Sequence, residues 1–251
     1  MVKSTNIEMV MDIFLIAKNL NQLEPDRKHY FMEAGAFDGI KQSNSFKLEK
    51  IDWQGILIEP CEESFKKLLI NRSECVKINC CLGAQNGPKL LKGTFLKGGL
   101  MATVKSNLKK RDSSSTKKDV ISKIFRKFKI NPMVREKYVP AKTFSEIIEE
   151  TKYPKIDIFI LDVEGYEIEV IKGIKKQHNP RILIVETRKN NSFEINDLML
   201  DKGYSLKLNL SNFNKIDNPT WSADHQDYLW VLDNDINASK SVQKLSSLKK
   251  I

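Results

Sequence analysis

The apolar residues of this chain follow two alternating spacings, which predict strands and helices in turn. Compact apolar runs of about four to eight residues are typical of strands buried in a parallel sheet. Between them, apolar residues recur every three or four positions, as in helices that pack by one face. The predicted strands are 30–33, 55–59, 76–83, 90–96, 155–162, 181–186, 204–210 and 227–232. The predicted helices are 7–20, 62–71, 144–150, 164–174 and 192–201, with a short one ending at 50 that Ser43, Asn44 and Ser45 cap.

This alternation predicts an α/β fold in which helices cover both faces of a parallel sheet. The last two strands leave no room for a crossover helix, so the final strand is expected to be antiparallel. A seven-stranded, mostly parallel sheet with an antiparallel last strand is the Rossmann-like arrangement of class I methyltransferases. We expect one such domain over residues 1–233, with a helical N-terminal extension over 1–29. Residues 234–251, rich in Ser, Lys and Asn, are expected to form a loosely attached or frayed polar tail.

The net charge of +10 is concentrated in one insertion, residues 97–138. Its segment 105–137 holds twelve basic and three acidic residues, a balance of +9. Within it runs an apolar stripe bordered by lysines and an arginine, formed by Val120, Ile121, Ile124, Phe125 and Phe128. Two readings stay open: a helix that lies on an anionic membrane surface, or a lid that packs over the acceptor site.

The four cysteines, Cys61, Cys75, Cys80 and Cys81, form no C-x-x-C pair, and we expect reduced thiols in the core. The chain has no run of eighteen apolar residues and no signal-peptide core near its first residue. These features favour a cytoplasmic protein, peripheral at the inner membrane face if the insertion binds lipid.

A glycine loop follows the first strand, from Gly35 to Gly39, and the second strand ends in Glu59 about twenty residues later. A strand, a glycine loop, a helix and an acidic strand tip are typical of a nucleoside site in which the carboxylate accepts hydrogen bonds from ribose. The loop lacks G-x-G-x-x-G and the lysine of a P-loop. Glu33 and Asp38 would repel a pyrophosphate but suit the cationic tail of S-adenosylmethionine, which is the predicted cofactor.

Several motifs resemble the FkbM family of S-adenosylmethionine-dependent methyltransferases. They are EAGAFDG at 33–39, SNS at 43–45, WQGILIEP at 53–60 and, most specifically, ILDVEGYE at 160–167. Thr143–Phe144 and the run 182–186 also fit, so the resemblance spans about residues 30–232, interrupted by the insertion. It implies O-methylation, usually of a sugar or of a natural-product hydroxyl. Glu33 stands where many relatives have aspartate.

The resemblance also implies roles for individual residues. Glu33, Gly35, Asp38 and Gly39 are expected at the methionine end of the cofactor, Glu59 at the ribose hydroxyls and residues 80–82 near the adenine. The full set of expected cofactor-binding residues is Glu33, Gly35, Asp38, Gly39, Ser43, Glu59, Pro60, Cys81 and Asp162.

A sugar hydroxyl is a poor nucleophile near neutral pH, so a general base is expected beside it. Asp162 ends the fourth strand, Glu164 follows it, and the antiparallel last strand brings His225 to the same edge. We predict Asp162, Glu164 and His225 as catalytic residues. Glu164 as a helix cap and His225 as a loop histidine without chemistry remain alternatives. An Asp162–Glu186 metal pair is conceivable, but no metal is assigned.

The expected acceptor is a sugar, a glycan or a glycosylated small molecule. One alternative is a methyltransferase-like module that binds without turnover. Another is a nucleic-acid methyltransferase, but the basic insertion lacks interleaved aromatic residues. The chain also lacks an Asn/Asp–Pro–Pro–Tyr motif and a clear Lys–Asp–Lys–Glu order. We therefore do not expect nucleic acid as a partner.

Overall fold

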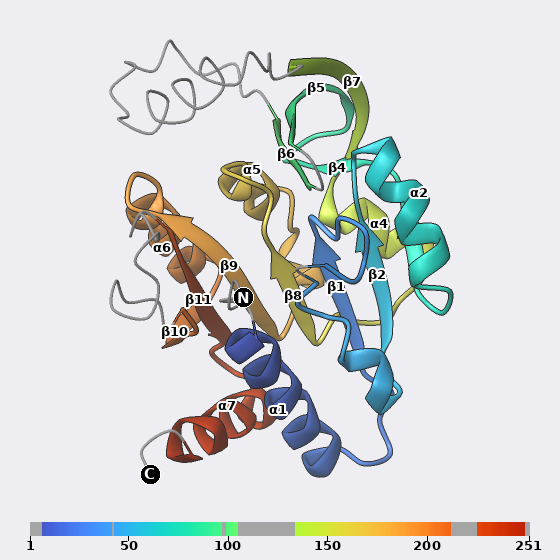
Figure 1. The fold of residues 1–251 in the computed structure, drawn as a ribbon. Helices are drawn as coiled ribbons and strands as arrows, with labels where there is room; N and C mark the ends of the chain where they lie inside the picture. The colour runs from blue at the N-terminus through green and yellow to red at the C-terminus, as the bar shows by residue number, and fades with distance from the viewer. Residues whose placement is uncertain (1–6, 42, 97–98, 105–133, 212–224, 249–251) are drawn as a thin grey trace, which may run out of the picture.

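The computed structural model describes residues 7–41, 43–96, 99–104, 134–211 and 225–248 (Figure 1). Within these residues the strands form two sheets, and the larger has the order β10-β11-β9-β8-β1-β2-β3. Its strands are β1 Tyr30–Ala34, β2 Gln54–Ile58, β3 Val76–Ile78, β8 Ile158–Leu161, β9 Ile182–Arg188, β10 Tyr204–Asn209 and β11 His225–Leu232. Only β11 runs against its neighbours β9 and β10, and the other pairs are parallel. The predicted α/β fold with an antiparallel last strand is confirmed.

Helices cover both faces of this sheet, because successive strand residues point to opposite sides. Phe31 of β1 lies in one core and Met32 in the other. The first core is covered by α1 (Ile7–Leu23), α2 (Glu62–Asn71) and α7 (Ile236–Leu248). The second is covered by α4 (Phe144–Thr151), α5 (Glu167–Lys172) and α6 (Ser192–Asp201). Two short 3-10 turns, η1 (Leu48–Ile51) and η2 (Lys176–His178), complete the described helices, all too short or too polar to cross a membrane.

The segment 76–83, predicted as one strand, instead forms two strands that belong to different sheets. β3 ends at Ile78, where the Cys80 amide turns back to donate to the Ile78 carbonyl. The chain then enters β4 (Cys81–Leu82), which pairs in parallel with β7 (Val134–Lys142). The second sheet, β4-β7-β5-β6, also contains β5 (Gly87–Leu96) and β6 (Gly99–Val104). β5 confirms the strand predicted at 90–96, and it begins three residues earlier, at Gly87.

The basic insertion is framed by this second sheet. β6 lies near its beginning, and β7 starts inside it and carries the chain back towards α4. At that junction the Thr143 hydroxyl accepts a hydrogen bond from the Glu146 amide at 3.1 Å, so Thr143 is the N-cap of α4, the helix predicted at 144–150. The apolar stripe of the insertion, from Val120 to Phe128, lies outside the described residues.

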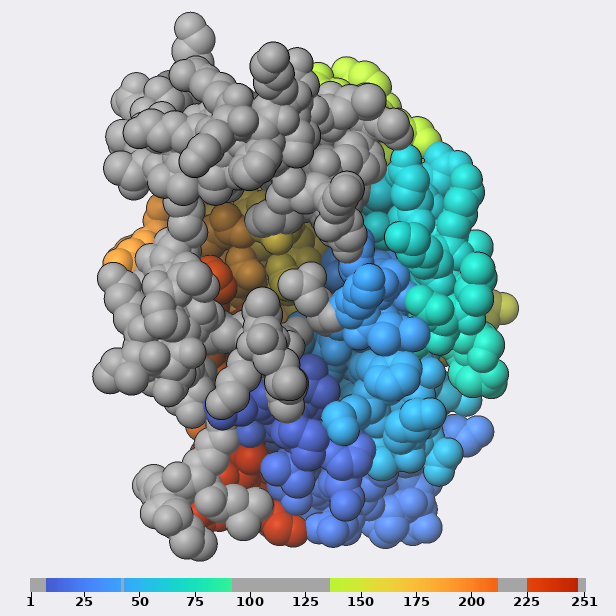
Figure 2. Space-filling model, in the orientation of Figure 1, coloured from blue at the N-terminus to red at the C-terminus, as the bar shows by residue number. Residues whose placement is uncertain are grey.

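The polar C-terminal segment is not loosely attached, which corrects the prediction of a frayed tail. Its helix α7 packs along α1, and their surfaces adjoin at the lower end of the molecule (Figure 2, red and dark blue). Val242 and Leu245 are buried in the first core. The Asn19 side chain of α1 donates a hydrogen bond to the Ser241 carbonyl at 3.0 Å. Apolar residues on one face are sufficient to hold an otherwise polar helix.

An ion-pair network joins α1, β8, β9 and α7 at the opposite edge from the strand carboxyl ends. The buried Arg181 guanidinium contacts the carboxylates of Glu24 at 2.7 Å, Asp157 at 2.9 Å and Asp235 at 2.6 Å. Burial acts to raise the pKa of Glu24, but hydrogen bonds from Arg181, Asn237 and Arg27 outweigh it and lower this pKa to about 2.

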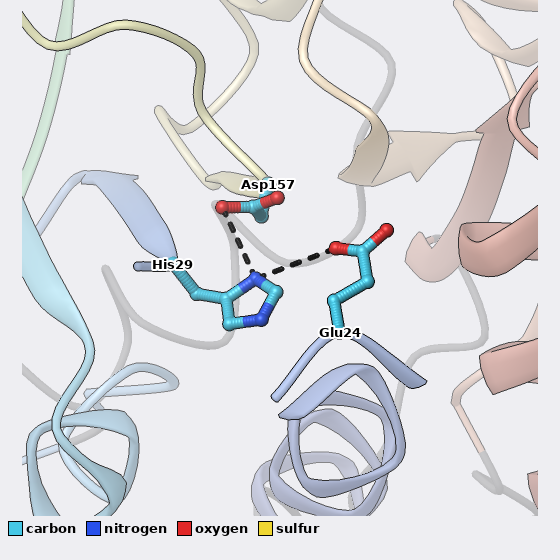
Figure 3. A group of neighbouring side chains, drawn as sticks. All are labelled: Glu24, His29 and Asp157. Atoms are coloured by element: carbon cyan, nitrogen blue, oxygen red, sulfur yellow. Dashed lines mark ion pairs between the residues drawn. The ribbon is translucent and has the colours of Figure 1, made fainter. Parts of the chain in front are cut away.

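His29 lies against two of these carboxylates (Figure 3). Its Nδ1 is 3.6 Å from Asp157 and 4.0 Å from Glu24, a grouping whose atoms would suit a metal ion. However, Arg27 and Arg181 both donate hydrogen bonds to Glu24 and to Asp157. Two guanidinium groups oppose a second cation at this place, so the cluster is a structural network.

The docking of α7 predicts a difference between two equivalent truncations. Leu245 is 1% exposed and Ile236 is 68% exposed, although both lie on α7. Leu245→Ala should lower the free energy of unfolding by about 2–5 kcal/mol because it leaves a cavity. Ile236→Ala, the matched control, should change it by about 0.5 kcal/mol or less. Urea unfolding measures both, and equal effects would mean that α7 does not pack as described.

Candidate active site

The glycine loop and the catalytic edge meet at Gly35. This residue has φ +86°, and a Cβ atom there would lie 1.9 Å from the carbonyl oxygen of Asp162. On the other side, the Asp162 amide donates to the Ala34 carbonyl at 3.2 Å. Any side chain at Gly35 would therefore push the ends of β1 and β8 apart. The predicted glycine loop is placed directly beside the predicted catalytic aspartate.

Glu59, at the tip of β2, holds the glycine loop to the next turn. Its carboxylate accepts hydrogen bonds from the amides of Phe37 at 2.9 Å and Cys61 at 2.8 Å. The side chain is buried, and this burial raises its pKa to about 7 although both amides act to lower it. Glu59 is thus a carboxylate kept away from water at the point where a ribose was expected.

The arrangement fits the nucleoside part of the predicted cofactor. Each Glu59 oxygen accepts one hydrogen bond from the described residues, so each keeps a lone pair for a ribose hydroxyl. The positive φ angles of Gly35 and Phe37 curve the loop around this carboxylate. Pro60 and Cys81 follow the tips of β2 and β3, and Cys81 is buried with Cys61 in a small apolar cluster. Within the part of the chain that the structure describes, these residues provide acceptors and apolar surface, as a nucleoside requires.

Asp38 and Gly39 make contacts that hold the glycine loop in its conformation. The Asp38 carboxylate accepts hydrogen bonds from the amides of Ile40 at 3.0 Å and Lys41 at 2.7 Å. A Cβ atom on Gly39 would lie 2.6 Å from the Cγ atom of Arg72, so only glycine fits there. Both residues therefore shape the loop, in addition to any contact with a ligand.

Glu33 is surrounded by the segment that was predicted to cap a helix. The hydroxyls of Ser43 and Ser45 donate to its carboxylate at 2.9 and 2.6 Å, and the Asn44 amide donates at 2.7 Å. The prediction of a cap is therefore wrong, because these groups face β1 and the chain forms only the short turn η1. Glu33 is 2% exposed, so its charge is directed into the protein.

A group of carboxylates surrounds Asp162 at the end of β8. Burial raises the pKa of Asp162 well above its ordinary value, and the negative charges of Glu186, Glu164, Asp227 and Glu167 add to this effect. Burial likewise raises the pKa of Asp227 and of Glu167. Burial and the neighbouring negative charges both favour the protonated form, so these groups take up a proton more readily than a carboxylate in water does.

Glu164 is not helical, which corrects the predicted helix 164–174 and the alternative of a helix cap. It has φ +56°, and α5 begins only at Glu167. The carboxylate of Glu167 accepts the Gly165 amide at 2.8 Å and holds the intervening turn. A non-glycine residue in this backbone conformation is held by its surroundings, which is frequent at functional sites.

Arg188 holds the two glutamates of this edge in place. Its Nη2 donates to Glu164 at 2.7 Å and to Glu186 at 3.1 Å. Burial raises the pKa of Glu186 to about 7, against the effect of Arg188. His225 begins β11 opposite Arg188, and its electrostatic interaction opposes the rise in the pKa of Glu186 and of Asp227. The structure thus brings Asp162, Glu164 and His225 to one edge, as predicted.

Sequence reasoning missed the roles of Arg72, Arg188 and Asp227. The sequence could have indicated Asp227, because an acidic residue at the start of an apolar strand is usually either exposed at the strand end or part of a functional site. Arg188 is the last residue of β9 and Arg72 directly follows α2, and a basic residue is ordinary at such places. The burial of Arg72 and the ion pairs of Arg188 depend on tertiary contacts that no local pattern contains.

The sheet order, the glycine loop after β1 and the carboxylates at the ends of β2 and β8 define a class I methyltransferase fold. Residues 33–206 match the family described as the methyltransferase FkbM domain. This match spans more than half of the chain, and the chain therefore belongs to the FkbM family. It is a methyltransferase, and S-adenosylmethionine is its methyl donor.

Structure comparison aligns the chain with methyltransferases of very low sequence identity. Fibrillarin from Aeropyrum pernix, solved with natively bound S-adenosyl-L-methionine, is 10% identical over 81% of this chain and 67% of its own, with a TM-score of 0.43. A TehB-like SAM-dependent methyltransferase from Corynebacterium glutamicum is 8% identical over 87% of each chain, with a TM-score of 0.37. The plantazolicin methyltransferase BpumL is 6% identical over 92% and 86%, with a TM-score of 0.44. No match is found among curated proteins.

The Glu59 carboxylate predicts a pH-dependent affinity for S-adenosylmethionine. Ribose hydroxyls donate to the charged form, so affinity should be full above pH 7, where this group is ionised. Below pH 7 the dissociation constant should rise by up to about tenfold for each pH unit, because protonation removes the acceptor. Glu59→Gln should weaken binding by about tenfold or more through the loss of a charged acceptor, and should abolish this pH dependence.

Isothermal titration from about pH 5.5 to about pH 8.5, a range on both sides of the Glu59 pKa of about 7, measures both effects. Glu62→Gln is the matched control, because Glu62 lies on the surface of α2 three residues away and pairs with Lys137 and Lys66. Equal affinity in Glu59→Gln and wild type at high pH would remove Glu59 from the cofactor site.

Proposed function

We propose that this chain transfers the methyl group of S-adenosylmethionine to a hydroxyl of a sugar, a glycan or a glycosylated small molecule. The observation that carries the proposal is the position of Asp162, whose backbone carbonyl lies against the glycine loop at Gly35 and whose carboxylate has further carboxylates around it. A hydroxyl must lose its proton as its oxygen accepts the methyl group, and this edge provides groups that accept protons near neutral pH.

Asp162 is the proposed general base. Its elevated pKa allows it to take the hydroxyl proton while the substrate oxygen forms its bond to the methyl carbon. The bond between that carbon and sulfur breaks in the same displacement, and alignment of the three atoms supplies much of the rate. Glu164 and Glu186, held by Arg188, line the acceptor side of the edge and are suited to bind neighbouring sugar hydroxyls.

The charge of this edge also favours the sugar over nucleic acid. Asp162, Glu164, Glu186 and Asp227 carry acidic groups, whereas Arg188 is already engaged with two of them. A phosphate backbone would be repelled here, while neutral hydroxyls gain acceptors. The presence of both a fitting cofactor site and a candidate base favours turnover over a module that binds only.

The proposal is tested first by a search for the acceptor. Nucleotide sugars, lipid-linked sugars and oligosaccharides are incubated with the protein and S-adenosylmethionine, and mass spectrometry detects the gain of one methyl group. Methylation of an amine, or of RNA with no sugar methylated, would contradict the proposed substrate class.

With an acceptor identified, Asp162→Asn should lower kcat by about 10²–10⁴-fold, because the amide keeps the shape but accepts no proton. The dissociation constant of S-adenosylmethionine should change little. In the wild-type protein kcat should fall as the pH is lowered, since a protonated Asp162 is no longer a base. Asp201→Asn, at the exposed end of α6, is the matched control and should retain full activity.

Two outcomes would contradict this role. Full activity of Asp162→Asn would leave Asp162 a structural residue and direct the search for the base to Glu164, Glu186 and His225. A large loss of cofactor affinity without a loss of kcat would place Asp162 in cofactor binding instead.

A further inference from the structure

Arg72 is a fully buried charged residue that lies outside the family motifs of the cofactor site. It directly follows α2, and none of its surface is exposed. Its Cγ atom lies under Gly39, where a Cβ atom would approach it to 2.6 Å. A buried guanidinium is tolerated only when its donors are paired, so its partners show what it holds.

These partners belong mainly to the segment that follows the glycine loop. Nη1 donates to the Gly39 carbonyl at 2.9 Å and to the Ser43 hydroxyl at 3.0 Å. Nη2 donates to the Ser45 hydroxyl at 3.1 Å, and Nε donates to the Glu49 carboxylate. All three nitrogens are therefore engaged, in a fork that lysine does not reproduce.

The two serine hydroxyls pass this interaction on to β1. Each accepts a hydrogen bond from Arg72 and donates one to the same oxygen of Glu33. The Asn44 amide donates to the other oxygen. Glu33 and Arg72 thus form one buried unit of opposite charges, joined by Ser43 and Ser45, that holds Gly39 and residues 43–45 against the strand.

We infer that Arg72 is a positioning residue for S-adenosylmethionine, which it does not itself contact. It acts through Ser43 and Ser45 on Glu33, and through the Gly39 carbonyl on the end of the glycine loop. The neighbouring Asn71 side chain donates to the Asp38 carbonyl at 2.8 Å, so the end of α2 holds this loop at two points. The inference rests on the proposed cofactor site, and it assigns Glu33 to holding the loop that binds the methionine end.

The first test compares Arg72→Lys with wild type. Lysine keeps the positive charge but has one nitrogen, so the relay to both serines is lost. The dissociation constant of S-adenosylmethionine, measured by isothermal titration, should rise at least about tenfold. The titration is carried out at low temperature, and urea unfolding under the same conditions checks that the variant is folded. Lys67→Met, on the exposed face of the same helix, is the control and should bind as wild type does.

A double substitution distinguishes a role of Arg72 in cofactor binding from a role in stability alone. Arg72→Met alone leaves the Glu33 charge buried without its partner, and the denaturation midpoint should fall. Combining it with Glu33→Gln should recover much of that stability, but not the affinity for S-adenosylmethionine. If Arg72→Lys does not fold, the double variant Ser43→Ala, Ser45→Ala is used instead. It removes the hydroxyls that join Arg72 to Glu33, while Arg72 keeps its hydrogen bonds to Gly39 and Glu49. The same loss of affinity for S-adenosylmethionine is expected.

The outcomes distinguish this inference from the function on which it rests. Wild-type binding together with unchanged affinity in folded Arg72→Lys, or in the serine pair, would overturn the inference alone. Recovery of both stability and affinity in the double variant would reduce Arg72 to a structural role. Failure of the wild-type protein to bind S-adenosylmethionine would overturn the cofactor site, and this inference with it.

Discussion

The close approach of β1 to β8 at Gly35 is the constraint on which the rest of the site depends. The loop backbone lies against the Asp162 carbonyl with no room for a side chain, so the cofactor loop and the catalytic edge are held side by side. The parallel register of β1 with both β2 and β8 then places Glu59 on one side and Asp162 on the other. A methyl donor bound at the first is thereby directed towards a base at the second.

The cofactor side and the catalytic side of the site share a second feature, which is that their carboxylates are shielded from water. Glu59 and Glu186 both have a pKa near 7, and Asp162 is raised well above its ordinary value, because the sheet removes them from water. At the opposite edge the carboxylates of Glu24 and Asp157 are paired with arginines, and their pKa values are lowered. The fold therefore separates acidic groups suited to structure from acidic groups suited to chemistry.

Local patterns predicted a mostly parallel sheet with an antiparallel last strand, most of the helices and the edge that carries the chemistry. Helices 62–71 and 192–201 agree with the structure at both ends, because their apolar spacing and flanking residues are complete in the sequence. Ser43 and Ser45 were misread because a hydroxyl that suits a helix cap serves equally well as a donor to a buried carboxylate. The docking of α7 was also missed, although Ala238, Val242 and Leu245 recur at helical spacing within its polar sequence. The positions of Arg72 and Arg188 depend on long-range contacts, which no local pattern contains.

The central claim is that one cofactor joins the Glu59 side of the edge to the Asp162 side. A crystal structure of the protein with S-adenosylhomocysteine, grown above pH 7 so that Glu59 is ionised, tests it most directly. The account predicts both ribose hydroxyls within hydrogen-bond distance of the Glu59 carboxylate and the sulfur atom facing the Asp162 side chain. A ribose bound away from Glu59, or a sulfur atom directed away from Asp162, would contradict it.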